Sequence, residues 1–259
     1  MVMVSSEAPL RWSASRDGVA VGQLHALLRP DARCYLLFLR GCEPQAYGPL
    51  LDAALDAVDR DLYVDVDETA GDLRRELAGR GFAVNRREDY YLVPTDPTVT
   101  SLAGRSMPDG FQIISAAEAD VDRLRDLDDT LRQDVPGTAG WRNDPAEFAR
   151  QTFGDPEYDP ATYLLAVDTA TDGYAGLVRV WVAPGRPRLG LVGTVPAHRR
   201  RGLATTLLAR AFAVLHARGQ PAVTCEVDRT NTASTALLTG LGARRTGGGV
   251  ELVLRRPPS

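Results

Sequence analysis

The segment VPAHRRRGLATTLL, residues 195–208, decides the fold, because it joins an apolar strand directly to an amphipathic helix. The strand is expected over RLGLVGTV, residues 188–195, and the helix over TTLLARAFAVLHAR, residues 205–218. Three arginines and a glycine, residues 199–202, stand between them. Such a segment fits three interpretations: a phosphate site at a helix N-terminus, a patch for nucleic acid, or an ordinary basic surface loop.

A turn of this composition can bind an anion through its main chain. Gly202 and Ala204 have little or no side chain, so a phosphate can approach the backbone closely. The first turn of the helix leaves N–H groups unpaired, and the helix dipole adds about half a positive charge there. The segment therefore predicts a pyrophosphate site. GK[ST] and GxGxxG motifs are missing from the sequence, which argues against a nucleotide P-loop and a dinucleotide fingerprint.

Composition limits the class of partner. The chain has 259 residues and a net charge of −4, so the molecule as a whole gives no electrostatic footprint for nucleic acid or an anionic membrane. The basic cluster at residues 199–201 is therefore local and favours a small anionic ligand. All 30 cationic side chains are arginine, which excludes a catalytic lysine.

Cysteine and histidine give no metal signature. Three cysteines and three histidines are widely spaced and form no metal-ligand motif, so no metal is expected. The first twelve residues do not resemble a signal peptide, and no apolar run approaches the ~20 residues of a membrane span. We expect a cytoplasmic protein without membrane or nucleic-acid partners, and the sequence leaves monomer and homodimer open.

A segment rich in proline, glycine, serine and threonine, residues 93–110, divides the chain. It predicts one domain over residues 1–95, a linker over 96–110 and a second domain over 111–259. Periodicity predicts strands and helices in both parts. Before the linker, strands are expected at 34–41, 62–68 and 88–94, and helices at 44–60 and 69–82. After it, strands are expected at 111–116, 162–169, 174–182, 188–195, 221–228 and 250–256, and helices at 117–133, 144–153, 205–218 and 231–242.

The two parts end in a similar order of elements, which indicates an internal repeat. Each part has a strand, a helix, a strand and a short helix, followed by GRGFAVNRR in the first part and GLGARRTGG in the second. The first part reads CEPQAYGPLL where the second reads RRRGLATTLL, so it lacks the arginines and the RGLA turn. Two unrelated α/β modules remain the alternative.

The second part resembles the GCN5-related N-acetyltransferases (GNAT). Their acyl-CoA signature R/Q-x-x-G-x-G/A follows a strand, and residues 199–204 match it as RRRGLA. A V/T-x-P step precedes it at 194–196, and the N-x-x-A/S element of the next turn matches Asn231 and Ser234. The resemblance covers roughly residues 110–256. The tandem organisation, with a degenerate first copy, resembles mycothiol synthase and its relatives.

The resemblance implies an α/β fold of two tandem GNAT-like modules. Each module would be a mixed, mostly antiparallel twisted sheet flanked by helices, with a degenerate N-terminal module. It also implies acetyl-CoA as co-substrate, with the pantetheine arm beside the strand that precedes the arginines. The implied cofactor-binding residues are Val192, Gly193, Thr194, Arg199, Arg200, Arg201, Gly202, Leu203, Ala204, Thr205, Asn231 and Ser234.

Glu226 is the candidate general base, since it lies on the strand before Asn231, where several family members carry a catalytic glutamate. Asp228 is the reserve candidate, and a solvated strand residue is the alternative interpretation of Glu226. Many family members have a tyrosine seven residues after the position of Asn231, and it acts as the general acid that protonates the CoA thiolate. This chain has Leu238 there. Cys225 has no histidine partner visible in the sequence, which argues against an acetyl-cysteine route.

Four residues on the loops and strand that face the thioester in this fold are expected to line the acceptor pocket: Asp134, Trp141, Arg179 and Trp181. The two tryptophans fit a core role equally well. The expected function is an acetyl-CoA-dependent N-acetyltransferase that transfers the acetyl group directly to a primary amine of a small molecule or peptide. The alternative is a non-catalytic acyl-CoA-binding sensor or scaffold, which the leucine at position 238 and the degenerate first part make plausible.

Overall fold

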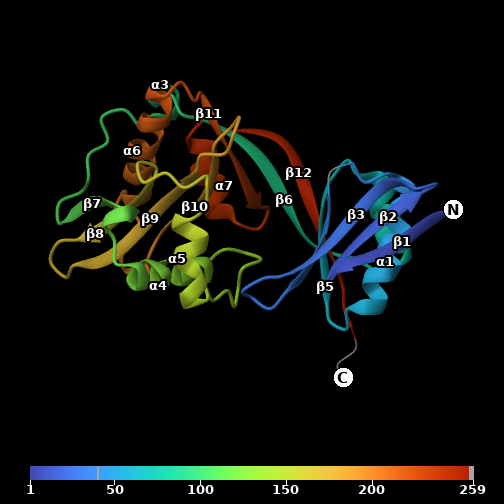
Figure 1. Cartoon of the computed structure of the whole chain (residues 1–259). Coiled ribbons are helices and arrows are strands. Elements are labelled where there is room, and N and C mark those ends of the chain that lie inside the picture. The colour runs from blue at the N-terminus through green and yellow to red at the C-terminus, as the bar shows by residue number, and fades with distance from the viewer. Residues whose placement is uncertain (40, 257–259) are drawn as a thin grey trace. The chain divides into compact units, whose positions relative to one another are not determined.

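The computed structural model describes residues 1–39 and 41–256, and they form two compact units. The first unit is Met1–Glu88 with Gly247–Ser259, and the second is Asp89–Thr246 (Figure 1). The boundaries fall inside two strands, β6 (Ala83–Pro94) and β12 (Arg244–Leu254), so each strand contributes to both units. These units differ from the predicted division at residues 95 and 111, because most of the last strand belongs with the first unit.

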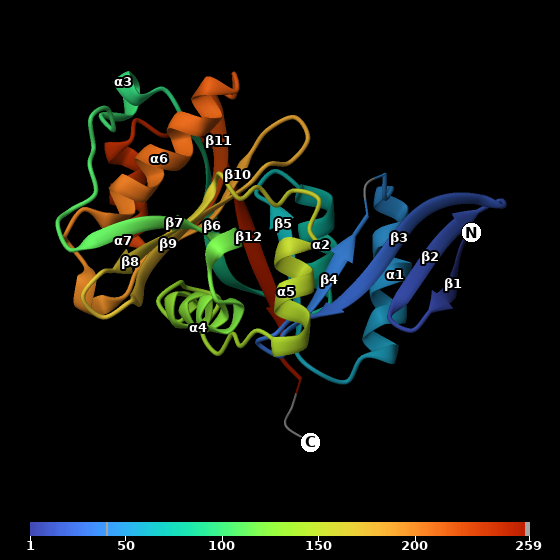
Figure 2. The same ribbon diagram turned by 60° about the vertical axis from the view of Figure 1, so that its left-hand side comes forward.

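The first unit is a sheet with two helices on one face. In chain order it contains β1 (Val2–Ala8), β2 (Arg11–Arg16), β3 (Val19–Leu28), β4 (Cys34–Phe38), α1 (Pro44–Ala57), β5 (Leu62–Asp67) and α2 (Gly71–Gly79). Its strand order is β1-β2-β3-β4-β5-β12, with one parallel step between β4 and β5. Leucines of α1 and α2 pack in one core with the sheet, and α1 contacts β2 and β3 (Figure 2).

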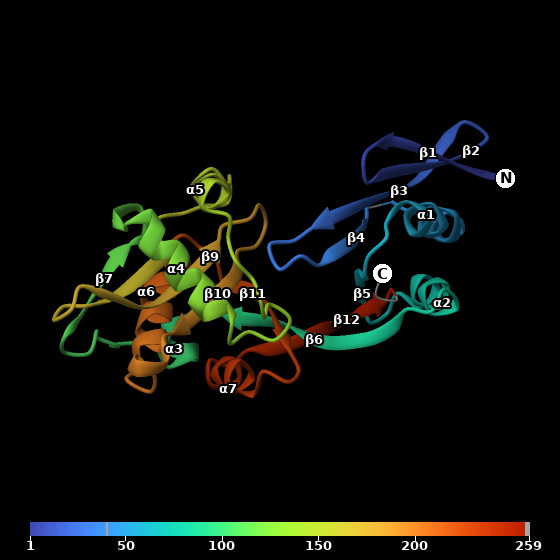
Figure 3. The same ribbon diagram turned by 90° about the horizontal axis from the view of Figure 1, so that it is seen from below.

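The second unit has helices on both faces of its sheet. After β6 it contains α3 (Pro97–Thr100), β7 (Phe111–Ser115), α4 (Val121–Arg132), α5 (Pro145–Phe153), β8 (Tyr163–Asp168), β9 (Gly173–Trp181), β10 (Arg188–Thr194), α6 (Leu203–Ala217), β11 (Ala222–Asp228) and α7 (Thr232–Gly240). Its strand order is β6-β11-β10-β9-β8-β7. One core cluster joins the sheet to α6, and a separate cluster joins it to α4 and α5, so these helices cover opposite faces (Figure 3).

Both units follow one plan, as the repeat predicted. In each, a helix joins two neighbouring parallel strands: α1 between β4 and β5, and α6 between β10 and β11. The second unit has α4 and α5 between β7 and β8, whereas only a turn separates β1 from β2. The last strands are exchanged, because β12 pairs with β5 and β6 lies beside β11. The mixed α/β fold with a tandem arrangement is therefore confirmed.

The pattern analysis missed the strands at 2–28 and the first halves of β6 and β12. The unpredicted part of β6 reads AVNRR and that of β12 reads RRTGGG, and asparagine and glycine are depleted in strands. Within the predicted linker, Asp96 caps α3 by accepting a hydrogen bond from Thr98 N at 2.8 Å. Arg40, part of the predicted strand at 34–41, lies outside the described residues. No helix in the described residues is long and apolar enough to cross a membrane.

Candidate functional site

The turn before α6 holds two residues in the left-handed region. Arg200 has φ +60° and Gly202 has φ +85°, and Gly202 is the N-cap of α6. The Gly202 carbonyl accepts from Thr205 Oγ1 at 2.8 Å and from Thr206 N at 3.0 Å. Residues 203–205 stand in the first helical turn, where N–H groups have no intrahelical acceptor. Left-handed residues close together in a turn direct backbone N–H groups toward one point, which is how main-chain anion sites are built.

The three arginine side chains of this turn differ in their contacts. Arg199 forms an ion pair with Asp134 and donates from Nε to the Thr194 carbonyl at 3.3 Å. The Arg201 guanidinium lies over the Phe111 ring at 5.8 Å. In the described part of the chain, no carboxylate pairs with Arg200 or Arg201, and both side chains are exposed. The turn is therefore locally cationic, which agrees with a seat for a small anion rather than with a wide nucleic-acid face.

The corresponding turn of the first unit has the opposite character. The N-cap of α1 is Glu43, and Pro44 occupies the first helical position. A carboxylate repels an anion at this point, and proline has no N–H group to donate. Of these two turns, only the one before α6 therefore has the features of a main-chain anion site.

β10 and β11 pair at one position and then separate. Arg188 pairs with Thr224, and Thr224 N donates to the Pro187 carbonyl at 2.9 Å. From Leu189 to Thr194, the described partners of β10 lie on β9 alone. Backbone groups on the other edge of this stretch, which includes Val192, Gly193 and Thr194, are therefore available to an added extended segment.

Glycines shape the face of β10 that lies toward α4. A shift in register between Leu189 and Leu191 leaves Gly190 as the additional residue of a bulge. A Cβ atom at Gly190 would lie 2.8 Å from Trp181 Nε1, so Trp181 packs directly on the bare backbone. A Cβ atom at Gly193 would lie 3.3 Å from the Leu131 side chain of α4.

Glu226 lies on the face of β11 that points away from α6. Its neighbours Cys225 and Val227 are buried in the core cluster with the α6 leucines, and strand side chains alternate between faces. Thr224 shares the face of Glu226, and its register partner is Arg188. Glu226 stands two residues beyond Thr224 on β11, after the point where β10 and β11 separate. The Glu226 side chain is exposed.

Asp228, the reserve candidate, is instead part of a turn. It is 6% exposed, and its carboxylate accepts hydrogen bonds from the backbone N–H (2.8 Å) and the hydroxyl of Thr230. These bonds fix the loop that leads from β11 to α7.

The N-terminus of α7 is capped by Asn231, whose Oδ1 accepts from Ser234 N at 3.0 Å. The two family-motif residues are thus bonded to each other. Leu238, at the position of the family's tyrosine, is 1% exposed and packs in the core cluster with α6. The structure therefore places no proton donor at that position.

Three of the four predicted acceptor-side residues, Trp141, Arg179 and Trp181, line one pocket of about 280 Å³. The fourth, Asp134, is not among its lining residues and instead pairs with Arg199. We call this cavity the arginine pocket. It is lined by Arg132, Trp141, Asn143, Phe148, Gln151, Thr152, Arg179, Trp181, Arg188 and Gly190.

A buried carboxylate organises the floor of the arginine pocket. Asp128, with a fully buried side chain, accepts from Arg179 Nη1 at 2.8 Å, from Arg132 Nε, and from Asn143 Nδ2 at 3.2 Å. Burial by itself would raise the pKa of Asp128, but the guanidinium groups of Arg179 and Arg132 outweigh it and hold this pKa below its usual value. Burial raises the pKa of the nearby Tyr163 hydroxyl to about 12, so this phenol stays protonated at neutral pH.

Sequence reasoning missed Asp128, Arg132, Arg188 and Gly190. Two signals were present: an Asp–Arg pair at i,i+4 on α4, and a single glycine inside a strand, which indicates a bulge. In residues 1–39 and 41–256, no group of three or more His, Cys, Asp or Glu side chains could hold a metal.

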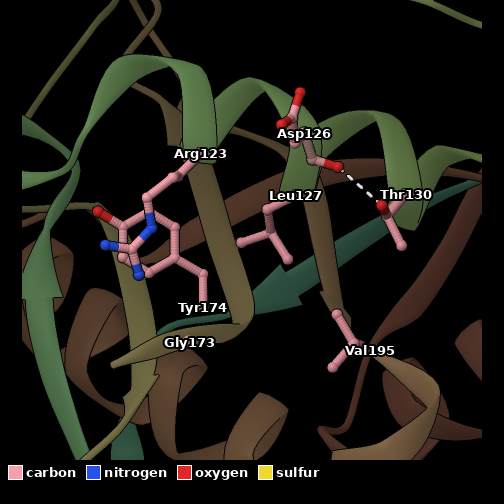
Figure 4. A pocket seen from close by; sticks show the side chains of 7 residues that line it. All are labelled: Arg123, Asp126, Leu127, Thr130, Gly173, Tyr174 and Val195. Atoms are coloured by element: carbon pink, nitrogen blue, oxygen red, sulfur yellow. Dashed lines mark hydrogen bonds between the residues drawn. The ribbon is translucent and has the colours of Figure 1, made fainter. Parts of the chain in front are cut away.

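A second hollow lies between α4 and the start of β9, and Figure 4 shows its lining. Its one cation, Arg123, is already bound, since it pairs with Asp172 at 3.0 Å and lies over the Tyr174 ring at 4.2 Å. Thr130 donates to the Asp126 carbonyl within the helix (Figure 4). This hollow therefore presents no unpaired charge to a ligand.

The comparisons with known proteins agree with this geometry. Residues 124–243 match the model of the acetyltransferase (GNAT) family, which places the second unit in the GNAT superfamily. The comparison with curated protein sequences gives no match.

Solved structures extend the likeness to the first unit. A GCN5-related N-acetyltransferase from Sphaerobacter thermophilus is 17% identical, with a TM-score of 0.73 over 98% of this chain and 84% of that one. A tandem GNAT protein from the clavulanic acid biosynthesis pathway, also 17% identical, has a TM-score of 0.70 over 96% and 83%. A GCN5-related N-acetyltransferase from Kribbella flavida, again 17% identical, has a TM-score of 0.59 over 100% and 90%. The tandem GNAT fold therefore covers nearly the whole chain.

Proposed function

We propose that the protein is an acetyl-CoA-dependent N-acetyltransferase that transfers the acetyl group directly to a primary amine of a small molecule or peptide. The observation that carries this proposal is the turn before α6, where Arg200 and Gly202 adopt left-handed conformations in front of unpaired helix N–H groups. The turn follows a strand that separates from its parallel neighbour. A phosphate seat next to an unpaired strand edge suits a pyrophosphate with an extended arm.

The residues of the second unit fit this ligand. Backbone N–H groups of residues 203–205 would hold the pyrophosphate, with the three arginines contributing positive charge around it. The open edge of β10 at residues 192–194 would pair with the pantetheine arm. Acetyl-CoA, when bound, supplies an activated acetyl group. The first unit is expected to bind no second copy, because Glu43 and Pro44 replace the phosphate-binding features.

Glu226 is the proposed general base. An amine acceptor arrives at neutral pH mostly as an ammonium ion and must lose a proton before it can attack. Glu226 stands on the face of β11 that also carries Thr224, whose register partner Arg188 lines the arginine pocket. This supports Glu226 as the group that accepts the proton of an amine held in that pocket.

Direct transfer is favoured over an acetyl-cysteine route by the position of Cys225. This residue is 8% exposed and belongs to the core cluster on the α6 side of the sheet. A thiol that packs in a core is shielded from an acyl donor and from a base.

A non-catalytic acyl-CoA sensor is the second candidate, and the buried Leu238 is the observation that favours it. Incubation with acetyl-CoA and a panel of primary amines separates the two functions, with free thiol and acetylated product measured together. We expect thiol release that depends on an amine and matches product formation. If acetyl-CoA binds but no amine yields product, the transferase proposal is wrong and the sensor is favoured.

A further inference from the structure

The arginine pocket has more positive charge than its own carboxylates neutralise. Three guanidinium groups line it, those of Arg132, Arg179 and Arg188. Two carboxylates contact its lining, and neither pairs with Arg188: Asp128 binds Arg132 and Arg179, and Asp129 is bound to Asn143 through the backbone N–H at 2.9 Å and the side-chain amide at 2.7 Å. The walls that complete the pocket are two indole rings and uncharged side chains.

Arg188 is the guanidinium group without a carboxylate partner. It begins β10, is exposed, and forms no ion pair within residues 1–39 and 41–256. Arg132 is already committed, since it binds Asp128 and lies 4.3 Å from the Trp141 ring centroid. An incoming anion therefore finds Arg188 as a free cation at the pocket's edge.

Arg179 has one donor that its protein neighbours leave unsatisfied. Arg179 is 5% exposed and binds Asp128 through Nη1, and its guanidinium also interacts with the Tyr163 hydroxyl, but the buried Nε atom forms no hydrogen bond of good geometry. This Nε lies 3.5 Å from the position of a Cβ at Gly190, beside the Trp181 indole, at the part of the pocket lining where β10 has no side chain. A buried donor without an acceptor is costly, and a ligand oxygen would satisfy it.

We propose that the acceptor is a small primary amine that also carries a carboxylate, and that Arg188 and Arg179 bind this carboxylate in the arginine pocket. The inference rests on the proposed acetyl transfer and names its substrate class. Guanidinium groups match carboxylates in geometry and charge, and the flanking indoles of Trp141 and Trp181 provide flat walls. A volume of about 280 Å³ suits an amino-acid-sized molecule rather than a folded protein surface.

Binding of product analogues tests this directly. N-acetylglycine, N-acetylserine and N-acetylleucine are titrated against the full chain, alongside their uncharged carboxamides, with tryptophan fluorescence as the readout. We expect at least one acid to bind at least tenfold more tightly than its carboxamide. Arg188→Gln should reduce this preference about tenfold, the usual range for loss of a charge-assisted hydrogen bond. Arg186→Gln is the matched control, because Arg186 carries the same charge two residues away and does not line the pocket.

The proposal is overturned if acids and carboxamides bind equally or if none binds up to about 10 mM. It is also overturned if Arg188→Gln leaves the acid preference intact or if Arg186→Gln removes it equally well. These probes contain no CoA and need no turnover, so the result is independent of transfer. Failure of acetyl-CoA to bind in a separate titration would instead refute the proposed function.

Discussion

Asp128→Asn should destabilise the second unit strongly, because Asp128 is the carboxylate that neutralises the buried Arg179. The substitution keeps the shape of the side chain but removes its charge. Arg179, 5% exposed, would keep its guanidinium charge with no carboxylate beside it. Breaking a buried ion pair in this way costs about 3–5 kcal/mol, and the remaining hydrogen bonds of the asparagine favour the lower end.

Urea unfolding followed by tryptophan fluorescence measures this cost. With a slope of about 2 kcal/mol/M, a loss of about 3 kcal/mol lowers the midpoint by about 1.5 M. Asp126→Asn is the control, since Asp126 stands on the same helix and its exposed carboxylate pairs with Arg125 at 3.0 Å. That exposed pair should contribute less than about 1 kcal/mol. Equal midpoints for the two variants would refute the reasoning.

The contribution of Asp128 also has a definite pH dependence. Its pKa is lower in the folded chain than the ordinary value of about 3.9. Its stabilisation is therefore fully present above the unfolded pKa and is lost as pH falls through the folded one. The difference between wild type and Asp128→Asn should be constant from neutral pH to about pH 5 and should shrink in stronger acid. A difference that grows on acidification would contradict the assigned sign.

Two further predictions concern the proposed base, Glu226, and the strand exchange. Glu226→Gln should lower turnover about a hundredfold at neutral pH and leave acetyl-CoA affinity unchanged. The loss of turnover should shrink as pH rises, because more of the amine is then unprotonated. A loss that is the same at every pH would assign Glu226 a structural role. A chain that starts at Met107 lacks β6, whose Val93 is fully buried in the core of the second unit. This shortened chain should therefore lose solubility, and a soluble, fully active fragment would contradict the prediction.

The conformation of the turn before α6 could be predicted from the sequence because it depends on local features. Glycine at 202 permits a left-handed φ, and the apolar spacing of residues 205–218 predicts the helix that follows. The structure has both in the expected order.

The arginine pocket could not be predicted in full, because its residues come together only through tertiary contacts. Arg132, Asn143 and Arg179 come from α4, the following loop and β9, and Asp128 joins them. The exchange of β6 and β12 was missed for another reason. Strand pairing between distant segments leaves no periodic mark, and the glycines at 247–249 argue against a strand there although β12 runs through them.

Calorimetric titration with acetyl-CoA tests the central claim most directly. We predict one site per chain for the wild type, an affinity at least tenfold weaker for Gly202→Val, and unchanged affinity for Gly219→Val. Gly219 is a matched control, since it follows the same helix α6, also has a left-handed φ of +74°, and has open space around its Cβ position. Two sites per chain, or equal affinity for the two variants, would contradict the assignment of the phosphate seat to the turn before α6.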